Sequence, residues 1–226
     1  MRIEIKYYID SKDISGIIDF STKYGIMDKY CVNEFGYKIQ STYIYEWEEH
    51  YQDLRGKLRL RNYFNTKYNN YFIEEKIKSG IWGTKNRCAI SENEYQAINN
   101  TSDTKTLRKN LYINNLAFFK SLPLEGRLFN LRIQYSRFAW VVEYQDIKFR
   151  LTIDRDIKCC IYDGYQHIVP PGTYILEIKG DKDLYSILDI FYKMFEVLPE
   201  KISKLDLGKK MLEDLKENSY MGDVVT

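Results

Sequence analysis

An α+β fold built on a large antiparallel sheet is predicted by two features of this sequence. The first is that six short segments carry charged residues on alternate positions with apolar residues between them, as expected of strands, whose successive side chains point to opposite faces. The second is the order of the elements along the chain, with strands and helices in alternating groups, which is typical of α+β domains. The six segments are 2–6, 57–61, 74–78, 85–87, 150–154 and 177–179.

The first half of the chain is predicted to contain strands and three helices. A strand over 2–9 precedes a helix from Ser11 to about Tyr24, with Ser11 as the N-cap and Gly25 as the C-terminal stop. Ser91 and Glu94 have the spacing of a capping box, which predicts a helix near 92–100. Further strands are predicted at 36–45, 57–64, 70–78 and 85–90, a hairpin turn at 65–70, and another helix at about 104–120.

The second half of the chain adds strands and ends in two amphipathic helices. Its predicted elements are strands at 130–144, 147–155, 158–163 and 173–180, a loop at 167–172, and helices at 183–197 and 205–217. The length of 226 residues suits a single domain over 1–226, with the C-terminal helices within 183–217 packing at its sheet.

About eight strands with one charged face are predicted to close into an antiparallel β-barrel with flanking helices. Closure removes unpaired edges and gives the charged side chains a common solvent-filled interior. An open sheet whose charged face is merely exposed to solvent is the alternative.

The charge of the chain is concentrated on these strands. The net charge is only +2, from 34 basic and 32 acidic residues, which argues against a nucleic-acid binder. The alternating positions of the predicted strands, however, include the ten basic residues named below and four acidic ones, so the predicted interior favours an anion with several charges. The basic ones are Lys6, Arg59, Arg61, Lys76, Lys78, Lys85, Arg87, Arg137, Arg150 and Lys179.

Other classes of protein are disfavoured by composition. The four cysteines form no C-x-x-C pair and only two histidines occur, which argues against a zinc site or a disulfide framework. No apolar run approaches the ~20 residues of a membrane span, and the first residues do not form a signal peptide. We therefore expect a soluble, cytoplasmic protein.

Nine stretches, in order along the chain, resemble the VTC domain of vacuolar transporter chaperone complexes, a branch of the triphosphate tunnel metalloenzymes with a CYTH-like fold. They are E-I-K-Y (4–7), S-T-Y-I-Y (41–45), K-L-R-L-R-N-Y (57–63), F-I-E-E-K-I-K (72–78), K-N-R (85–87), Y-S-R-F-A (135–139), F-R-L-T-I-D-R (149–155), L-E-I-K (176–179) and K-I-S-K (201–204).

This resemblance implies an eight-stranded antiparallel tunnel whose basic residues hold a linear triphosphate or polyphosphate. It implies a polyphosphate polymerase, a transferase that moves the terminal phosphate of ATP to a growing chain with manganese, Mn²⁺ (or Mg²⁺), as cofactor. It also implies a separate membrane-protein partner, and we expect a monomer or weak oligomer that binds no nucleic acid.

The resemblance assigns roles to individual residues. Catalysis falls to Arg59, Arg61, Lys76, Arg137, Arg150 and Glu177. Phosphate contacts fall to Lys6, Arg59, Arg61, Lys76, Lys85, Arg87, Tyr135, Arg137, Arg150, Lys179, Lys201, Ser203 and Lys204. Glu177 is the expected metal ligand, and Glu4 and Glu74 are further candidates.

Other functions and roles remain open at this point. The hydrolytic CYTH relatives begin with E-x-E-x-K, whereas this chain has Arg2-x-Glu4-x-Lys6, which favours the VTC branch. An inorganic triphosphatase or nucleoside triphosphatase, and a non-catalytic polyphosphate- or inositol-phosphate-binding module, are the alternatives. Asp154 either orients a basic neighbour or acts in the site, Glu75 is expected at the surface, and the loop at 80–84 beside Trp82 is a candidate contact for a nucleotide base.

Overall fold

The computed structural model describes residues 3–31, 36–49, 54–64, 70–79, 82–113, 126–161, 164–181 and 184–222. The chain divides into two compact units. Unit 1 comprises residues 1–38 and 134–226, and unit 2 comprises residues 39–133. Arg2, the turn at 65–69 and residues 114–120 of the predicted helix lie outside the described residues.

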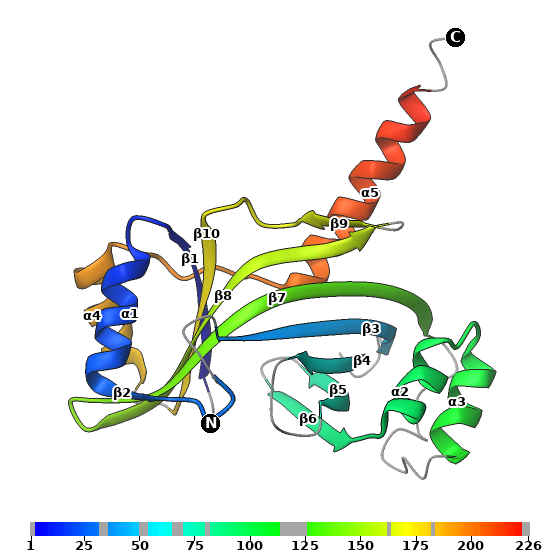
Figure 1. Ribbon diagram of the computed structural model, residues 1–226, viewed down its shortest axis with the longest axis horizontal. Helices are drawn as coiled ribbons and strands as arrows, with labels where there is room; N and C mark the ends of the chain where they lie inside the picture. The colour runs from blue at the N-terminus through cyan, green and yellow to red at the C-terminus, as the bar shows by residue number, and fades with distance from the viewer. Residues whose placement is uncertain are drawn as a thin grey trace. The chain divides into compact units, whose positions relative to one another are not determined.

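The sheet confirms the α+β prediction (Figure 1). The hydrogen-bonded order of its strands is β1-β10-β8-β7-β3-β4-β5-β6, with β2 paired to β7 and β9 paired to β8. Closure into a barrel is not confirmed, because the order of the described strands ends at β1 and at β6. The strands are β1 (Ile3–Asp10), β2 (Gly25–Met27), β3 (Tyr37–Glu49), β4 (Leu54–Phe64), β5 (Tyr71–Ser79), β6 (Trp82–Ala89), β7 (Arg127–Tyr144), β8 (Ile147–Ile161), β9 (Gly164–His167) and β10 (Thr173–Gly180).

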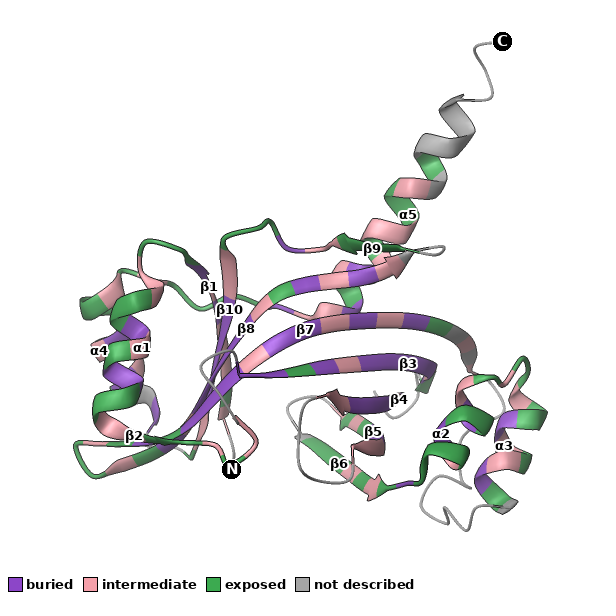
Figure 2. Cartoon of the chain, in the orientation of Figure 1, coloured by how far each residue is buried: buried purple, intermediate pink, exposed green. Residues whose placement is uncertain are grey.

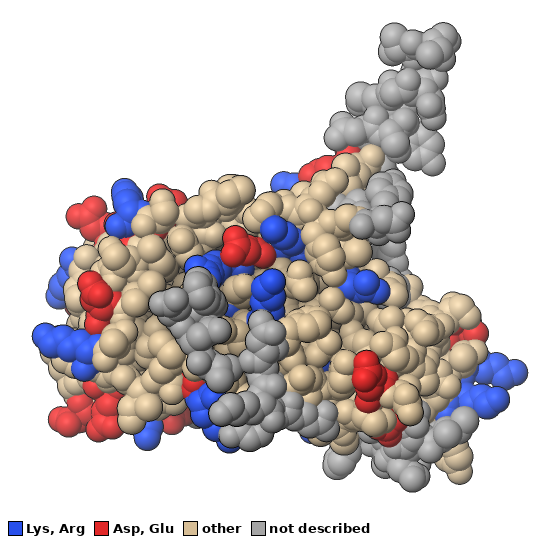
Figure 3. Space-filling view, viewed as in Figure 1, with Lys and Arg blue, Asp and Glu red and all other residues tan. Residues whose placement is uncertain are grey.

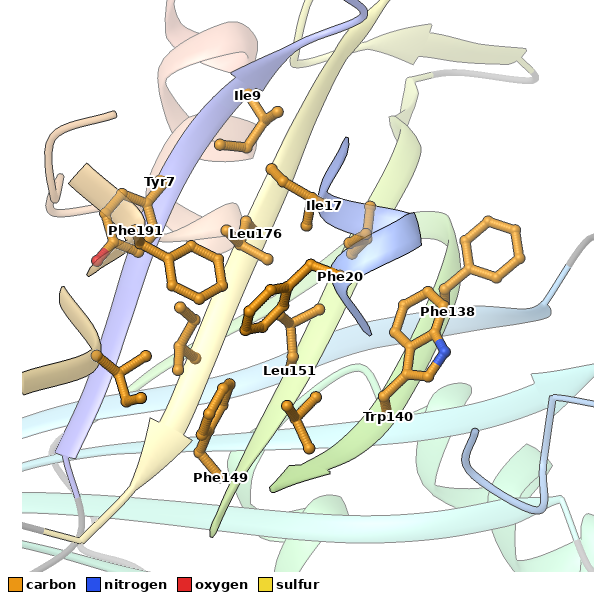
Figure 4. Close-up of a cluster of buried hydrophobic side chains, with 14 of the residues drawn as sticks. Tyr7, Ile9, Ile17, Phe20, Phe138, Trp140, Phe149, Leu151, Leu176 and Phe191 are labelled. Carbon is orange, nitrogen blue, oxygen red and sulfur yellow. The ribbon is translucent and has the colours of Figure 1, made fainter. Parts of the chain in front are cut away.

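Unit 1 has its hydrophobic core on one face of β1, β10, β8 and β7. Helices α1 (Ile14–Tyr24) and α4 (Leu184–Phe195) supply Phe20 and Phe191, whose ring centroids lie 5.4 Å apart. Their side chains meet Leu151 and Leu176 from the strands (Figure 4). Because strand side chains alternate between faces, this packing leaves the charged residues of the same strands on the other face.

Unit 2 follows the same plan with β3, β4, β5 and β6. Its core contains Leu58, Leu60 and Ile73 from the strands together with residues of α2 (Glu92–Asn99) and α3 (Thr104–Ile113). The predicted capping box begins α2, since the Ser91 side chain accepts a bond from the Glu94 amide and the Glu94 carboxylate accepts one from the Ser91 amide.

Several local features differ from the prediction. Helix α1 begins later than expected, with Asp13 and not Ser11 at its N-cap position. The predicted strands 147–155 and 158–163 form one strand, β8, which passes through Asp156 at a φ of 52°. Gly25 ends α1 as expected, but it also starts the short strand β2. Glu75 was expected at the surface but is buried, because it lies on the face of β5 that α2 and α3 cover. Its carboxylate accepts a hydrogen bond from Asn86 Nδ2 at 3.1 Å.

The C-terminal helix α5 (Lys204–Gly222) agrees with the helix predicted at 205–217. Buried and accessible residues alternate over residues 156–160 of β8, as Figure 2 shows. In the part of the chain that the structure describes, no helix combines the length and the apolar character needed to span a membrane.

Candidate functional site

Unit 2 gathers basic side chains around one buried carboxylate, a group that we call the Glu74 cluster (Arg59, Arg61, Glu74, Lys85 and Arg87). Antiparallel pairing places Arg59 of β4 and Arg87 of β6 on either side of Glu74 of β5. Arg59 Nη2 lies 2.6 Å and Lys85 Nζ 2.8 Å from the Glu74 carboxylate oxygens. Arg61 and Arg87 approach at 3.6 and 3.5 Å.

The electrostatics of the Glu74 cluster favour binding of an anion. Glu74 is 1% exposed. Burial alone would raise its pKa, but Arg59, Arg61 and Lys85 outweigh burial and hold the pKa well below its ordinary value. Burial lowers the pKa of Lys85 to about 8, since Arg61 and Arg59 add to its effect and together they outweigh the Glu74 carboxylate, which raises the pKa. Four basic groups share one carboxylate, which leaves a local excess of three positive charges at neutral pH.

A row of three lysines continues the charged face of unit 2. Lys57, Lys76 and Lys85 are register partners across β4, β5 and β6. Lys76 is exposed, so it is accessible to a ligand. The predicted phosphate-binding residues of unit 2 are therefore all brought to one face of its sheet.

Unit 1 contains a different arrangement, the Glu177 cluster (Glu4, Lys6, Glu177 and Lys179). Strands β1 and β10 place Lys6 opposite Glu177 and Glu4 opposite Lys179. Lys179 Nζ lies 2.8 Å from Glu177 and 3.2 Å from Glu4, and Lys6 Nζ lies 3.2 Å from Glu4 and 3.8 Å from Glu177. Burial opposes ionisation of Glu177, but Lys179 and Arg137 outweigh it and hold its pKa well below the ordinary value.

The Asp154 cluster (Arg137, Asp154 and Lys204) is the most buried ionic group of unit 1 among the described residues. Arg137 donates to both carboxylate oxygens of Asp154, at 2.6 and 2.7 Å, and Lys204 Nζ lies 2.7 Å away. Tyr135, on the same strand face as Arg137, has its ring 4.9 Å from Lys204 Nζ. Asp154 therefore orients two predicted phosphate-binding residues.

The segment before α5 is fixed to β1 through Lys6. The Lys6 ammonium donates to the Ile202 carbonyl at 2.8 Å, and the Glu200 amide donates to the Lys6 carbonyl at 2.8 Å. Ser203 Oγ accepts from the Asp206 amide at 3.4 Å and so caps α5, whereas Lys201 is exposed. Of the three predicted residues in this segment, only Lys204 joins the buried ionic group.

Arg150 lies on the same face of β8 as Asp154 but has another acidic partner. Its Nη2 atom is 2.7 Å from the carboxylate of Asp28. Asp28 was not a candidate, because the turn after β2 carries no charge alternation that would mark it. A contact between residues so far apart in the chain has no signature in a single sequence.

The sequence analysis did not predict Tyr43, Tyr63 and Phe72 as site residues, although the pattern of the strands could have indicated two of them. Tyr63 and Phe72 continue the alternation of Arg59, Arg61 and of Glu74, Lys76 by one more step. Arg61 Nη1 donates to the Tyr63 hydroxyl at 3.2 Å, and Arg59 Nη1 donates to the Tyr43 hydroxyl at 3.3 Å.

The paired carboxylates of unit 1 fit a divalent cation better than Glu74 does. The ammonium of Lys179 lies between Glu4 and Glu177, so both carboxylates already share one positive charge. Mn²⁺ and Mg²⁺ commonly take one or two carboxylates and complete their shell with water and phosphate oxygens. No group of three or more metal-binding side chains occurs among the described residues, so such external ligands would be required. Glu74 is engaged by basic side chains instead.

Basic and acidic side chains are interspersed on the face seen in Figure 3. The model of one protein family, described as the VTC domain, matches residues 1–208. The chain belongs to the VTC family. This VTC domain thus agrees with the resemblance carried by the ordered motifs.

Similarity to individual proteins is low. A search of curated proteins found no match to this chain. The PH1819 protein from Pyrococcus horikoshii OT3 is 16% identical, with coverage of 95% of this chain and 99% of that chain and a TM-score of 0.47. One chain of the Schizosaccharomyces pombe Mediator head module is 9% identical, with coverage of 88% of this chain and 99% of that chain and a TM-score of 0.44.

Proposed function

We propose that this VTC domain is a polyphosphate polymerase that transfers the terminal phosphate of ATP to a growing phosphate chain. The observation that carries the proposal is the Glu74 cluster, where four basic side chains surround a single carboxylate. Such an excess of charge suits a ligand with several adjacent phosphates. Membership of the VTC family supports a polyphosphate as that ligand.

Phosphoryl transfer depends on alignment and charge neutralisation more than on covalent chemistry by the protein. Arg59 and Arg61 are two residues apart on one strand face, a spacing of roughly 6–7 Å, so they can contact two different phosphates of one chain. One arginine guanidinium can donate two parallel hydrogen bonds to phosphate oxygens, and a lysine ammonium adds a point charge. The side chains of Lys76, Lys85 and Arg87 extend this binding surface.

Unit 1 would hold a metal site of its own beside further basic side chains. Glu177 and Glu4 would hold Mn²⁺ or Mg²⁺, which when bound neutralises charge on phosphate oxygens. Lys6 and Lys179 now neutralise these carboxylates, so their ammonium groups would be released for phosphate when the metal takes their place. Arg137 and Arg150 are oriented by Asp154 and Asp28, respectively.

The closed eight-stranded tunnel implied by the family remains part of this proposal, as do a cytoplasmic location and a separate membrane-protein partner. The function is tested by incubating the protein with ATP and Mn²⁺ and separating the products by chain length. We expect chains that lengthen with time. Release of single phosphates without longer chains would contradict the proposal and identify a hydrolase.

A further inference from the structure

The charged face of unit 2 has an aromatic end. The Cζ atom of Arg87 lies 3.7 Å from the centre of the Phe72 ring and 5.3 Å from that of Tyr63. The two rings meet edge to face, with centroids 5.6 Å apart. Tyr63, Phe72 and Arg87 therefore form one packed group, which we call the aromatic patch.

The aromatic patch is fixed to the Glu74 cluster. Arg87 Nε is 3.5 Å from Glu74 Oε1, and Arg61 donates to the Tyr63 hydroxyl. The same side chains that would bind phosphate thus hold the patch in place. Its position next to the phosphate-binding residues is set by strand register rather than by a loop.

Part of the aromatic patch is accessible to a ligand. The side chain of Arg87 is 39% exposed, and Tyr63 and Phe72 are half-buried. Across the strands, Phe72 has Arg61 as one register partner and Ala89 as the other. Ala89 is exposed, and its methyl group covers less of Phe72 than a longer side chain would.

The charged face of unit 2 therefore changes along its strands from aromatic at one end to basic at the other. The row of Phe72 is followed by the row of Glu74 and then by the row of Lys76, at steps of roughly 6–7 Å. A planar apolar group joined to a line of negative charges matches this order. Nucleoside triphosphates have that form, whereas inorganic tripolyphosphate lacks the planar part.

We infer that the aromatic patch stacks the base of a nucleoside triphosphate whose phosphates lie in the Glu74 cluster. This inference rests on the proposed function, because it requires phosphates to bind there. Bases stack on aromatic rings and on guanidinium planes, and such stacking tolerates all bases. The site therefore accepts ATP and GTP with similar affinity. The base contact lies at the Phe72 end of β5.

The test compares ATP, GTP and inorganic tripolyphosphate by calorimetry in EDTA, where metal-dependent transfer does not occur. Phe72→Leu keeps an apolar side chain and removes the ring. We expect it to weaken binding of ATP and GTP by roughly 5- to 50-fold, on the scale of one stacking contact. Binding of tripolyphosphate should be unchanged. Tyr192→Leu, at an exposed aromatic residue of α4 in unit 1, should alter neither.

A second variant keeps the inference testable if Phe72→Leu folds poorly. Phe72→Trp offers a larger ring and should preserve or raise the ratio of ATP affinity to tripolyphosphate affinity. Equal losses for both ligands, or no loss for either, would overturn the base site while leaving phosphate binding and the proposed function intact. If the unmodified protein binds neither ATP nor tripolyphosphate, whether EDTA or Mn²⁺ is present, both the base site and the proposed function are wrong.

Discussion

The Nζ atom of Lys204 lies 2.7 Å from Oδ2 of Asp154, a carboxylate with no exposed surface. Lys204 is the first residue of α5, so a buried ion pair anchors the start of that helix to β8. Burial alone would lower the pKa of Lys204, but the Asp154 carboxylate outweighs it and raises the pKa. The family resemblance implies that Lys204 binds phosphate, and in the structure it also holds the start of α5 against β8.

Replacement of Asp154 by Asn should strongly destabilise the fold. The change leaves Arg137 and Lys204 buried without a counter-charge, and breaking a buried pair in this way costs about 3–5 kcal/mol. The free energy of unfolding in urea measures the effect. Asp189→Asn is the control, because its ion pair with Lys193 is exposed and should contribute about 0.5 kcal/mol or less. Equal effects of the two changes would show that the Asp154 cluster adds little stability.

Acid should reduce stability through the same buried carboxylates. The basic residues around Asp154, Glu177 and Glu74 outweigh burial and hold each pKa below its ordinary value. As the pH falls below about 5, the unfolded chain therefore binds more protons than the folded protein, and stability is lost progressively. Urea unfolding between pH 7 and pH 3 measures this slope. A stability that does not change over this range would contradict the electrostatic description of these clusters.

Lys76→Ala should weaken anion binding without weakening the fold. Lys76 is exposed between Lys57 and Lys85, so a contact that it makes at the surface adds little stability, and its removal also relieves repulsion between like charges. We expect the affinity for tripolyphosphate to fall roughly tenfold, the scale of one charged hydrogen bond. The melting temperature should be unchanged or higher. Lys193→Ala, on the exposed side of α4, should leave affinity unchanged.

Binding of tripolyphosphate should also weaken as the pH rises through about 8. The pKa of Lys85 is lowered to about 8, so above this pH its side chain loses the positive charge that attracts phosphate. Between pH 7 and pH 9 the loss should be at most roughly tenfold, since one proton is involved. Calorimetry at both values gives the ratio. Lys85→Arg should keep its affinity at pH 9, and a ratio equal to that of the unmodified protein would exclude Lys85 as the titrating group.

The alternation of charged and apolar residues was sufficient to predict the two faces of most strands. It correctly placed Arg59, Arg61 and Lys85 on one face, because strand geometry has a period of two. It did not reveal that Asp28 meets Arg150, since this contact depends on tertiary folding. The unbroken strand β8 was missed because the turn-like sequence around Asp156 is accommodated at a positive φ within the strand.

The proposal that this VTC domain makes polyphosphate is tested by the chain length of its product. The protein is incubated with γ-labelled ATP and Mn²⁺, and labelled products are resolved on a gel beside those of Glu177→Gln and Arg59→Ala. We expect a ladder of lengthening chains for the unmodified protein and little or no ladder for either variant. Labelled phosphate that is released only as single units, or no turnover by a protein that binds tripolyphosphate, would contradict it.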